Sequence, residues 1–91
     1  MTDTTNSASS SIDAYGADWC GDCKRAKAAL TRLGAAYTWH NIETEDGAAD
    51  RAVEISGQKH IPVVLYGDGA FQVEPSATDI EQKLKELGVI D

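Results

Sequence analysis

Cysteine is scarce in this sequence, with two among its 91 residues. Small domains that rely on disulfides for stability carry a denser set, because their cores are too small to hold them together. Here 42% of the residues are hydrophobic, which is enough to form a core without such crosslinks. The two cysteines are therefore not expected to form a structural framework.

Basic residues are also scarce, with 8 Lys and Arg against 15 Asp and Glu and a formal net charge of −7. A chain of this charge repels a nucleic-acid backbone, so we expect no nucleic-acid partner. The first ten residues contain neither a positively charged segment nor an apolar run, so we expect no secretion signal and no membrane anchor. We therefore predict a cytoplasmic protein, in which closely spaced cysteines are more often catalytic or metal-binding than permanently crosslinked.

The chain divides into a short tail and one domain. Residues 1–10 are rich in Ser, Thr and Asn, a composition that buries too little apolar surface to offset the entropy of ordering, and this predicts a flexible N-terminal tail. Residues 11–91 suffice for one small domain, and we find no internal repeat in them.

The first half of the domain predicts a strand, a helix and a second strand. Residues 11–17 form a short, partly alternating apolar run. Residues 21–33 have apolar positions at helical spacing opposite basic side chains, and Gly34 is suited to end that helix. Residues 35–42 alternate as a second strand. The apolar stripe of the helix consists of Cys23, Ala26, Leu30 and Leu33.

The second half predicts a helix, a hairpin and a final helix. Acidic residues within positions 43–46 favour the start of a helix that ends at Gly57. The apolar residues 61–66 predict a buried strand, and the turn sequence GDG joins it to a hairpin partner in AFQVE. Ser76 is suited to cap the last helix, with Asp79 at its N3 position. The order βαβαββα predicts an α/β fold with a mixed four-stranded sheet flanked by helices.

The cysteines form a C-x-x-C motif at the predicted junction of the first strand and the first helix. Free N–H groups and the positive end of the helix dipole favour a thiolate at Cys20, and a thiolate is the species that attacks a disulfide. Cys23, one turn further along the helix, can then attack the mixed disulfide and release the product. Asp22 is expected to disfavour the Cys20 thiolate and Lys24 to favour it, so these two residues are predicted to tune the pair.

Two other interpretations of the cysteine pair fit the sequence less well. A zinc site needs two further ligands, and the sequence offers only His40 and His60, at a spacing unlike that of finger modules. A reduced and buried structural pair conflicts with the position of Cys20 outside the helical stripe. The junction of strand and helix therefore favours thiol–disulfide exchange without a bound metal.

These residues resemble the thioredoxin superfamily and, within it, the small glutaredoxins. The matching order is a strand, WCGDC, a helix, a strand, a helix, HIPVVLY, a hairpin and a final helix. The resemblance implies a thioredoxin fold, a cis proline at Pro62, and a backbone at Ile61 that is free to pair with a substrate. A small thiol would then lie between Cys20, Ile61, Pro62 and the start of the last helix. The resemblance implies further contacts from that helix end, from a loop lysine and from an aromatic residue at the rim: Ser76, Ala77, Thr78, Asp79, Lys59 and Trp19.

The sequence departs from the usual glutaredoxin pattern at two places. It has CGDC where glutaredoxins typically show C-P-Y-C, and VEPSATD where they carry a Gly-Gly pair that holds the glutamyl part of glutathione. Its motifs are instead similar to those of the actinobacterial mycoredoxins, which reduce mixed disulfides of mycothiol, a thiol without a glutamyl group. The resemblance thus implies an enzyme that reduces mixed disulfides between proteins and a low-molecular-weight thiol, with mycothiol favoured over glutathione and no tightly bound cofactor. Nothing in the sequence demands more than a monomer.

Two other functions stay open. One is a dithiol redoxin that is reduced by thioredoxin reductase and donates electrons to protein disulfides, although such redoxins commonly show a W-S-G-F run that VEPSATDIEQ lacks. The other is a [2Fe-2S] carrier, in which Cys20 of two subunits and two small thiols hold the cluster. Visible absorption after anaerobic reconstitution distinguishes the carrier.

Overall fold

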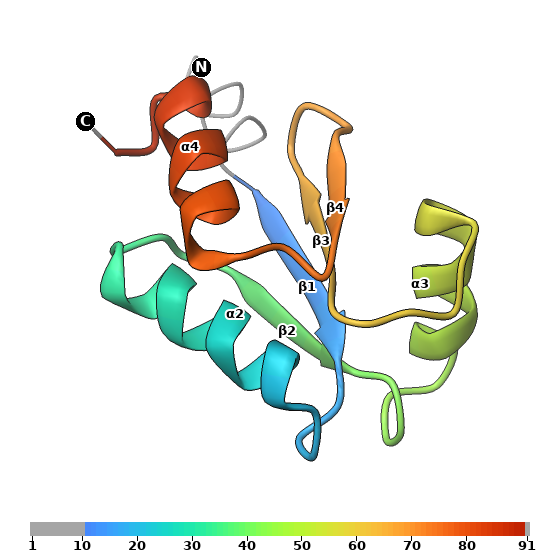
Figure 1. The fold of residues 1–91 in the computed structure, drawn as a ribbon. Helices are drawn as coiled ribbons and strands as arrows, with labels where there is room; N and C mark the ends of the chain where they lie inside the picture. The colour runs from blue at the N-terminus through green and yellow to red at the C-terminus, as the bar shows by residue number, and fades with distance from the viewer. Residues whose placement is uncertain (1–10, 91) are drawn as a thin grey trace.

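The computed structural model of the protein describes residues 11–90 and contains one mixed four-stranded sheet in the order β2-β1-β3-β4 (Figure 1). Strand β1 (Ile12–Gly16) pairs in parallel with β2 (Thr38–Asn41) and antiparallel with β3 (Val63–Tyr66). Strand β4 (Phe71–Val73) completes a hairpin with β3. The flexible tail predicted at the N-terminus lies outside the described residues.

Three helices cover the two faces of this sheet, as Figure 1 shows. Helices α2 (Gly21–Arg32) and α4 (Ala77–Leu87) lie together on one face, and α3 (Ala48–Ser56) lies on the other. The predicted order βαβαββα and the α/β thioredoxin fold are therefore confirmed.

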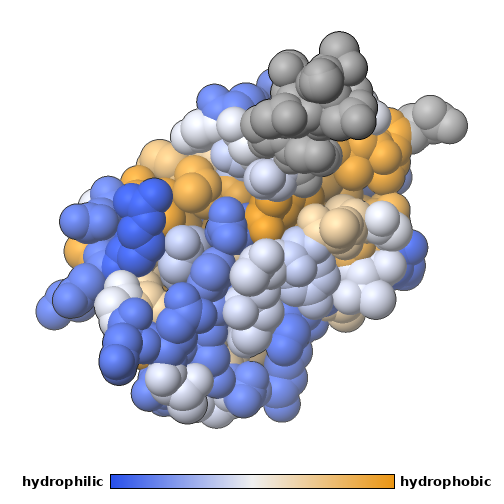
Figure 2. Space-filling model, turned by 180° about the vertical axis from the view of Figure 1, so that it is seen from behind, coloured by the Kyte–Doolittle hydropathy of each residue, from blue (hydrophilic) through white to orange (hydrophobic). Residues whose placement is uncertain are grey.

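Side chains along the central strands alternate between the two faces of the sheet, so the same strands contribute to a hydrophobic core on each face. Ala14 and Val64 face α2 and α4, whereas their neighbours Tyr15 and Val63 face α3. The rear face of the molecule is mainly polar toward its lower end and carries apolar patches nearer its upper edge (Figure 2). The larger core consists of Ile12, Ala14, Ala26, Ala29, Leu30, Ala35, Val64, Tyr66, Ile80 and Leu84.

The start of α3 differs from the prediction. Acidic residues at positions 43–46 were expected to begin this helix, but it begins at Ala48, after Gly47 at φ 81° and without a side-chain cap. The reason is that the acidic side chains have other partners: Glu43 binds Trp19 and Glu45 binds His40. These residues form a turn between β2 and α3 instead of a helical turn.

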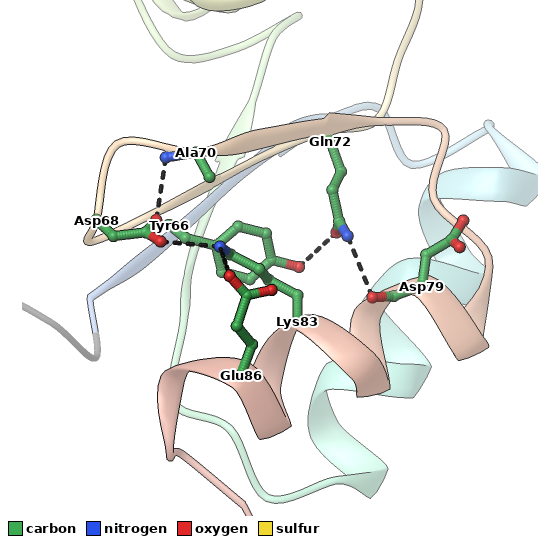
Figure 3. Close-up of polar contacts among 7 residues, drawn as sticks. All are labelled: Tyr66, Asp68, Ala70, Gln72, Asp79, Lys83 and Glu86. Atoms are coloured by element: carbon green, nitrogen blue, oxygen red, sulfur yellow. Dashed lines mark hydrogen bonds and ion pairs between the residues drawn. The ribbon is translucent and has the colours of Figure 1, made fainter.

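Hydrogen bonds fix the start of α4 against the hairpin (Figure 3). Tyr66 Oη donates to Gln72 Oε1 at 2.5 Å, and Gln72 Nε2 donates to the backbone C=O of Asp79 at 3.1 Å. Further along the helix, Lys83 Nζ lies 2.8 Å from Asp68 Oδ2 in the hairpin turn. The helix end predicted to contact a thiol is thus tied to the sheet.

The predicted capping box of α4 is present. The N–H of Asp79 donates to Ser76 Oγ at 3.0 Å, and the N–H of Ser76 donates to Asp79 Oδ2 at 3.0 Å. The helix ends at Gly88, which has φ 77° and lies in the left-handed region that glycine adopts readily.

Candidate active site

The two cysteines have different environments at the start of α2. Cys20 is the N-cap residue, and its Sγ accepts a hydrogen bond from the N–H of Cys23 at 3.3 Å. Cys20 is partly exposed, whereas Cys23 is completely buried. The Cys20 sulfur lies at the N-terminus of α2 and is accessible, so the geometry suits Cys20, and not Cys23, to attack a disulfide.

The burial of Cys23 keeps this residue in its thiol form. Desolvation, together with the hydrogen bond to Cys20, raises the pKa of Cys23 to about 12. A buried thiol with this pKa is a poor nucleophile near neutral pH. Cys20 is therefore the residue suited to attack the substrate disulfide first. Cys23 must lose its proton before Cys23 can react.

Gly16 is a site residue that the sequence analysis missed. A Cβ on Gly16 would lie 2.5 Å from Cys23 Sγ and 2.6 Å from a ring carbon of Trp39, so no larger residue fits there without displacing one of them. The signal in the sequence was a glycine at the end of the first strand, four residues before Cys20. It predicted a strand end, but not a close contact with the second cysteine.

The Ile61–Pro62 peptide bond is cis and directly precedes β3. Tyr15 pairs with Val63 in the antiparallel register, so Pro62 lies one residue beyond this pair, at the same end of β1 as Gly16, the residue that contacts Cys23. Within residues 11–90 no backbone hydrogen bond uses the N–H or C=O of Ile61. This backbone is available to an extended ligand.

The N-terminus of α4 offers fewer free donors than the sequence indicated. The N–H of Asp79 is bonded to Ser76 Oγ, because these residues form the capping box. Ala77 and Thr78 are exposed, and their N–H groups form no backbone hydrogen bond within the described residues. Two of the three predicted N–H donors are therefore available.

The predicted charged residues lie at different places around the site. Asp22 pairs with Arg25 one turn further along α2, so its charge is partly compensated. Lys24 is exposed on the same helix. Lys59 borders a pocket of about 290 Å³ between α3 and the segment that precedes β3. The pocket is lined by Ile42, Ala49, Asp50, Ala52, Val53, Gln58, Lys59, His60 and Ile61.

Trp19 lies at the rim, beside Cys20, and 68% of its surface is exposed. Trp39, by contrast, packs against the larger core, with Lys27 Nζ 4.4 Å from its ring centroid. The two tryptophans thus have different roles, since only Trp19 presents its ring to solvent next to the nucleophile.

Within residues 11–90, neither histidine forms a hydrogen bond with Cys20 or Cys23. His40 bridges two carboxylates, Asp13 at 2.8 Å and Glu45 at 2.8 Å, and its ring stacks on Tyr15. His60 lines the pocket described above. Over residues 11–90, no cluster of three or more metal-ligating side chains is found, and no helix is long and apolar enough to span a membrane.

Comparison with known proteins identifies the family. A family model named Glutaredoxin matches residues 12–71, from the start of β1 to the start of β4. A Mycobacterium tuberculosis H37Rv protein named "Putative glutaredoxin" is 35% identical over 74 residues, which cover 80% of this chain and 88% of that protein. Mycoredoxin 1 of Corynebacterium glutamicum is 25% identical over 79 residues, covering 86% of this chain and 98% of that protein.

A solved structure agrees with these relatives. The glutaredoxin grx-1 of Archaeoglobus fulgidus superposes with a TM-score of 0.67 at 31% identity, and the match covers 84% of this chain and 83% of that one. The family model covers the C-x-x-C motif and the cis proline as well as most of the sheet. The chain therefore belongs to the glutaredoxin family and is a thiol–disulfide oxidoreductase of the glutaredoxin type.

Proposed function

We propose that this enzyme reduces mixed disulfides between cytoplasmic proteins and a low-molecular-weight thiol, and that mycothiol is preferred over glutathione. The observation that carries the proposal is the asymmetry of the pair. Cys20 is an accessible N-capping sulfur, and Cys23 is a buried thiol behind it. A single accessible nucleophile is sufficient to remove a small thiol from a protein.

The first step transfers the small thiol to the enzyme. The Cys20 thiolate attacks the small-thiol sulfur of the mixed disulfide, a new disulfide forms between them, and the protein cysteine leaves as a thiolate that takes up a proton. A second small-thiol thiolate then attacks the adduct, releases Cys20 as a thiolate, and leaves as the oxidised disulfide of the thiol. No bound cofactor takes part in these exchanges.

Cys23 offers a second route for the adduct. Its thiolate would attack Cys20 Sγ, form the Cys20–Cys23 disulfide and expel the small thiol. Burial and the raised pKa of Cys23 oppose this route near neutral pH. We therefore propose that the small thiol, and not Cys23, resolves most of the adduct.

The groove for the small thiol is proposed to run from Cys20 along Ile61 and Pro62 to the start of α4. Its peptide-like part would pair with the free backbone of Ile61, and its polar end would accept hydrogen bonds from the N–H groups of Ala77 and Thr78. Lys59 is proposed to add a charge contact.

The proposed preference for mycothiol rests on the segment VEPSATD, which stands where other glutaredoxins have the residues that bind glutathione. The chain has VEPSATD where glutaredoxins carry a Gly-Gly pair, and one of its relatives is Mycoredoxin 1 of Corynebacterium glutamicum. The N–H of Asp79, in this segment, is engaged by Ser76 and is not available to a glutamyl group.

The test compares one reporter protein that carries a single cysteine blocked either by mycothiol or by glutathione. We expect a higher kcat/KM for the mycothiolated reporter, each measured with its own thiol as reductant. Equal values, or a preference for the glutathionylated reporter, would contradict the mycothiol assignment while leaving the glutaredoxin activity intact.

A further inference from the structure

Cys20 lies between two different surfaces, because the sheet order places β2 on one side of β1 and β3 on the other. On the β3 side are Ile61 and Pro62, where the proposed thiol groove runs. On the β2 side, the loop that carries Cys20 meets the end of β2 and the turn at residues 42–47, and Figure 1 shows both at the same end of the sheet. The two halves of a mixed disulfide at Cys20 can therefore meet different neighbours.

Two side-chain hydrogen bonds join the Cys20 loop to this turn. Trp19 Nε1 donates to Glu43 Oε2 at 2.7 Å, and Asn41 Nδ2 donates to Asp18 Oδ2 at 3.4 Å. The first of these is short and has an ionised acceptor, which makes it the stronger contact. It fixes the indole of the residue directly before the nucleophile.

The turn that carries Glu43 is itself held in shape. Asn41 Oδ1 accepts from the N–H of Glu43 at 2.9 Å, and the C=O of Asn41 accepts from the N–H groups of Thr44 and Glu45 at 3.2 and 2.9 Å. Glu45 is in turn bonded to His40 on β2 at 2.8 Å. The Glu43 carboxylate is thus presented from an ordered turn.

The Trp19 side chain is held by the hydrogen bond of its Nε1, and most of the rest of its surface is exposed to solvent. With 68% of its surface exposed, it contributes little to the core, although burial of an indole is strongly favourable. An exposed tryptophan held in one orientation is suited to contact a protein, since tryptophan is enriched among the residues that dominate interface affinity. We propose that Glu43 is a positioning residue that holds Trp19 as the contact surface for the polypeptide half of the mixed disulfide.

The assignment to the polypeptide half follows from the placement of the two surfaces. The small thiol is assigned to the β3 side of Cys20, so the protein half meets the residues left exposed, and on the β2 side these include Trp19. The inference rests on the proposed function and extends it by naming the residues that receive the protein. Glu43 acts only through Trp19, whereas Trp19 touches the substrate.

The test measures kcat and KM for two substrates of the same small thiol: its mixed disulfide with a folded reporter protein and its mixed disulfide with free cysteine. We expect Glu43→Ala to raise KM for the protein substrate roughly two- to tenfold, the range for loss of a typical hydrogen bond, because the Trp19–Glu43 contact is exposed to solvent; kcat should be unchanged. The cysteine substrate, which has no polypeptide, should show wild-type values.

Two further variants separate positioning from a general effect of the mutation. Glu43→Gln keeps a side-chain oxygen that can accept from Trp19 Nε1, so it should restore the KM for the protein substrate. Glu54→Ala removes an exposed carboxylate of α3 and should behave as wild type. Equal loss with both substrates, or no rescue by glutamine, would overturn the positioning role.

Trp19→Phe tests the hydrogen bond itself, because it keeps an aromatic ring but lacks the N–H donor. If Glu43 acts through the indole, Glu43→Ala adds no further loss to Trp19→Phe; additive losses would contradict the proposal. If wild type turns over neither substrate, the proposed function fails and the docking role with it. Turnover of both by Glu43→Ala at wild-type KM overturns the docking role alone.

Discussion

At the scale of single residues, the difference between the two cysteines follows from where each lies relative to α2. Cys23 lies on the apolar stripe and is buried, and the sequence indicated this through its helical spacing with Ala26 and Leu30. Cys20 precedes the helix and becomes its N-cap. The close contact between Gly16 and Cys23 could not be predicted, because it depends on how tightly α2 packs against β1.

We expect an alkylating reagent such as iodoacetamide to modify Cys20 and to leave Cys23 almost unmodified in the reduced native protein at pH 7.5. The reason is that Cys23 is fully buried and its pKa is raised to about 12. Tandem mass spectrometry of the reduced protein locates the modification. In Cys20→Ser, the remaining thiol should react only when the protein is unfolded. Rapid modification of Cys23 in the folded variant would show that the pair is not asymmetric.

We expect Gly16→Ala to lower the free energy of unfolding by about 1–3 kcal/mol, the usual cost of overpacking a core. The added methyl group would overlap Cys23 Sγ and the Trp39 ring. Denaturant unfolding of the reduced protein measures this loss. Gly21→Ala is the matched control, because its added methyl group would have only Arg25 within reach, at 3.6 Å. The account is contradicted if the two substitutions have equal effects.

At the scale of elements, side chains that the sequence left without a role join neighbouring segments. His40 on β2 reaches Asp13 on β1 with one ring nitrogen and Glu45 in the following turn with the other. Its partners come from two other segments, β1 and the turn that follows β2, so the pattern of a single strand could not reveal them. By contrast, the capping box of α4 was predicted, because all its atoms lie within four residues of the chain.

We expect the link made by His40 to weaken as the pH rises. Burial opposes the charged imidazolium, but the bonds to Asp13 and Glu45 outweigh this and raise the pKa of His40 above its usual 6.5. A raised folded-state pKa means that the stabilisation is complete below pH 6.5 and is lost as the pH rises through the folded-state value. Stability of wild type should therefore fall over this window more steeply than that of His40→Gln. Parallel pH profiles from denaturant unfolding would refute the link.

We expect Ser76→Ala to lower the free energy of unfolding by about 1 kcal/mol, the typical cost of removing an N-cap side chain. The substitution removes Ser76 Oγ, which in the wild type accepts a hydrogen bond from the N–H of Asp79. Ser76→Asp should recover most of the loss, because its carboxylate can cap the same N–H. Thermal or denaturant unfolding gives the comparison, and an alanine variant as stable as wild type would mean that the cap contributes nothing.

At the scale of the whole molecule, local patterns predicted the order of elements and the α/β class. The helical stripe near the cysteines, the apolar strand before the GDG turn and the final capped helix each carried a clear signal. The sequence was least informative between β2 and α3. The acidic residues there indicated the start of a helix, but two of them form hydrogen bonds with Trp19 and His40. Such contacts arise from the assembled sheet, because only the fold brings the ends of β1 and β2 together.

The account depends most on Cys20 as the residue that receives the small thiol, and intact-protein mass spectrometry tests this directly. Cys23→Ser, incubated with a mycothiolated reporter protein, should gain the mass of one mycothiol on Cys20 while the reporter loses it. Cys20→Ser should gain nothing under the same conditions. A covalent enzyme–reporter adduct without transferred mycothiol, or an adduct on Cys23 in Cys20→Ser, would contradict the proposed mechanism.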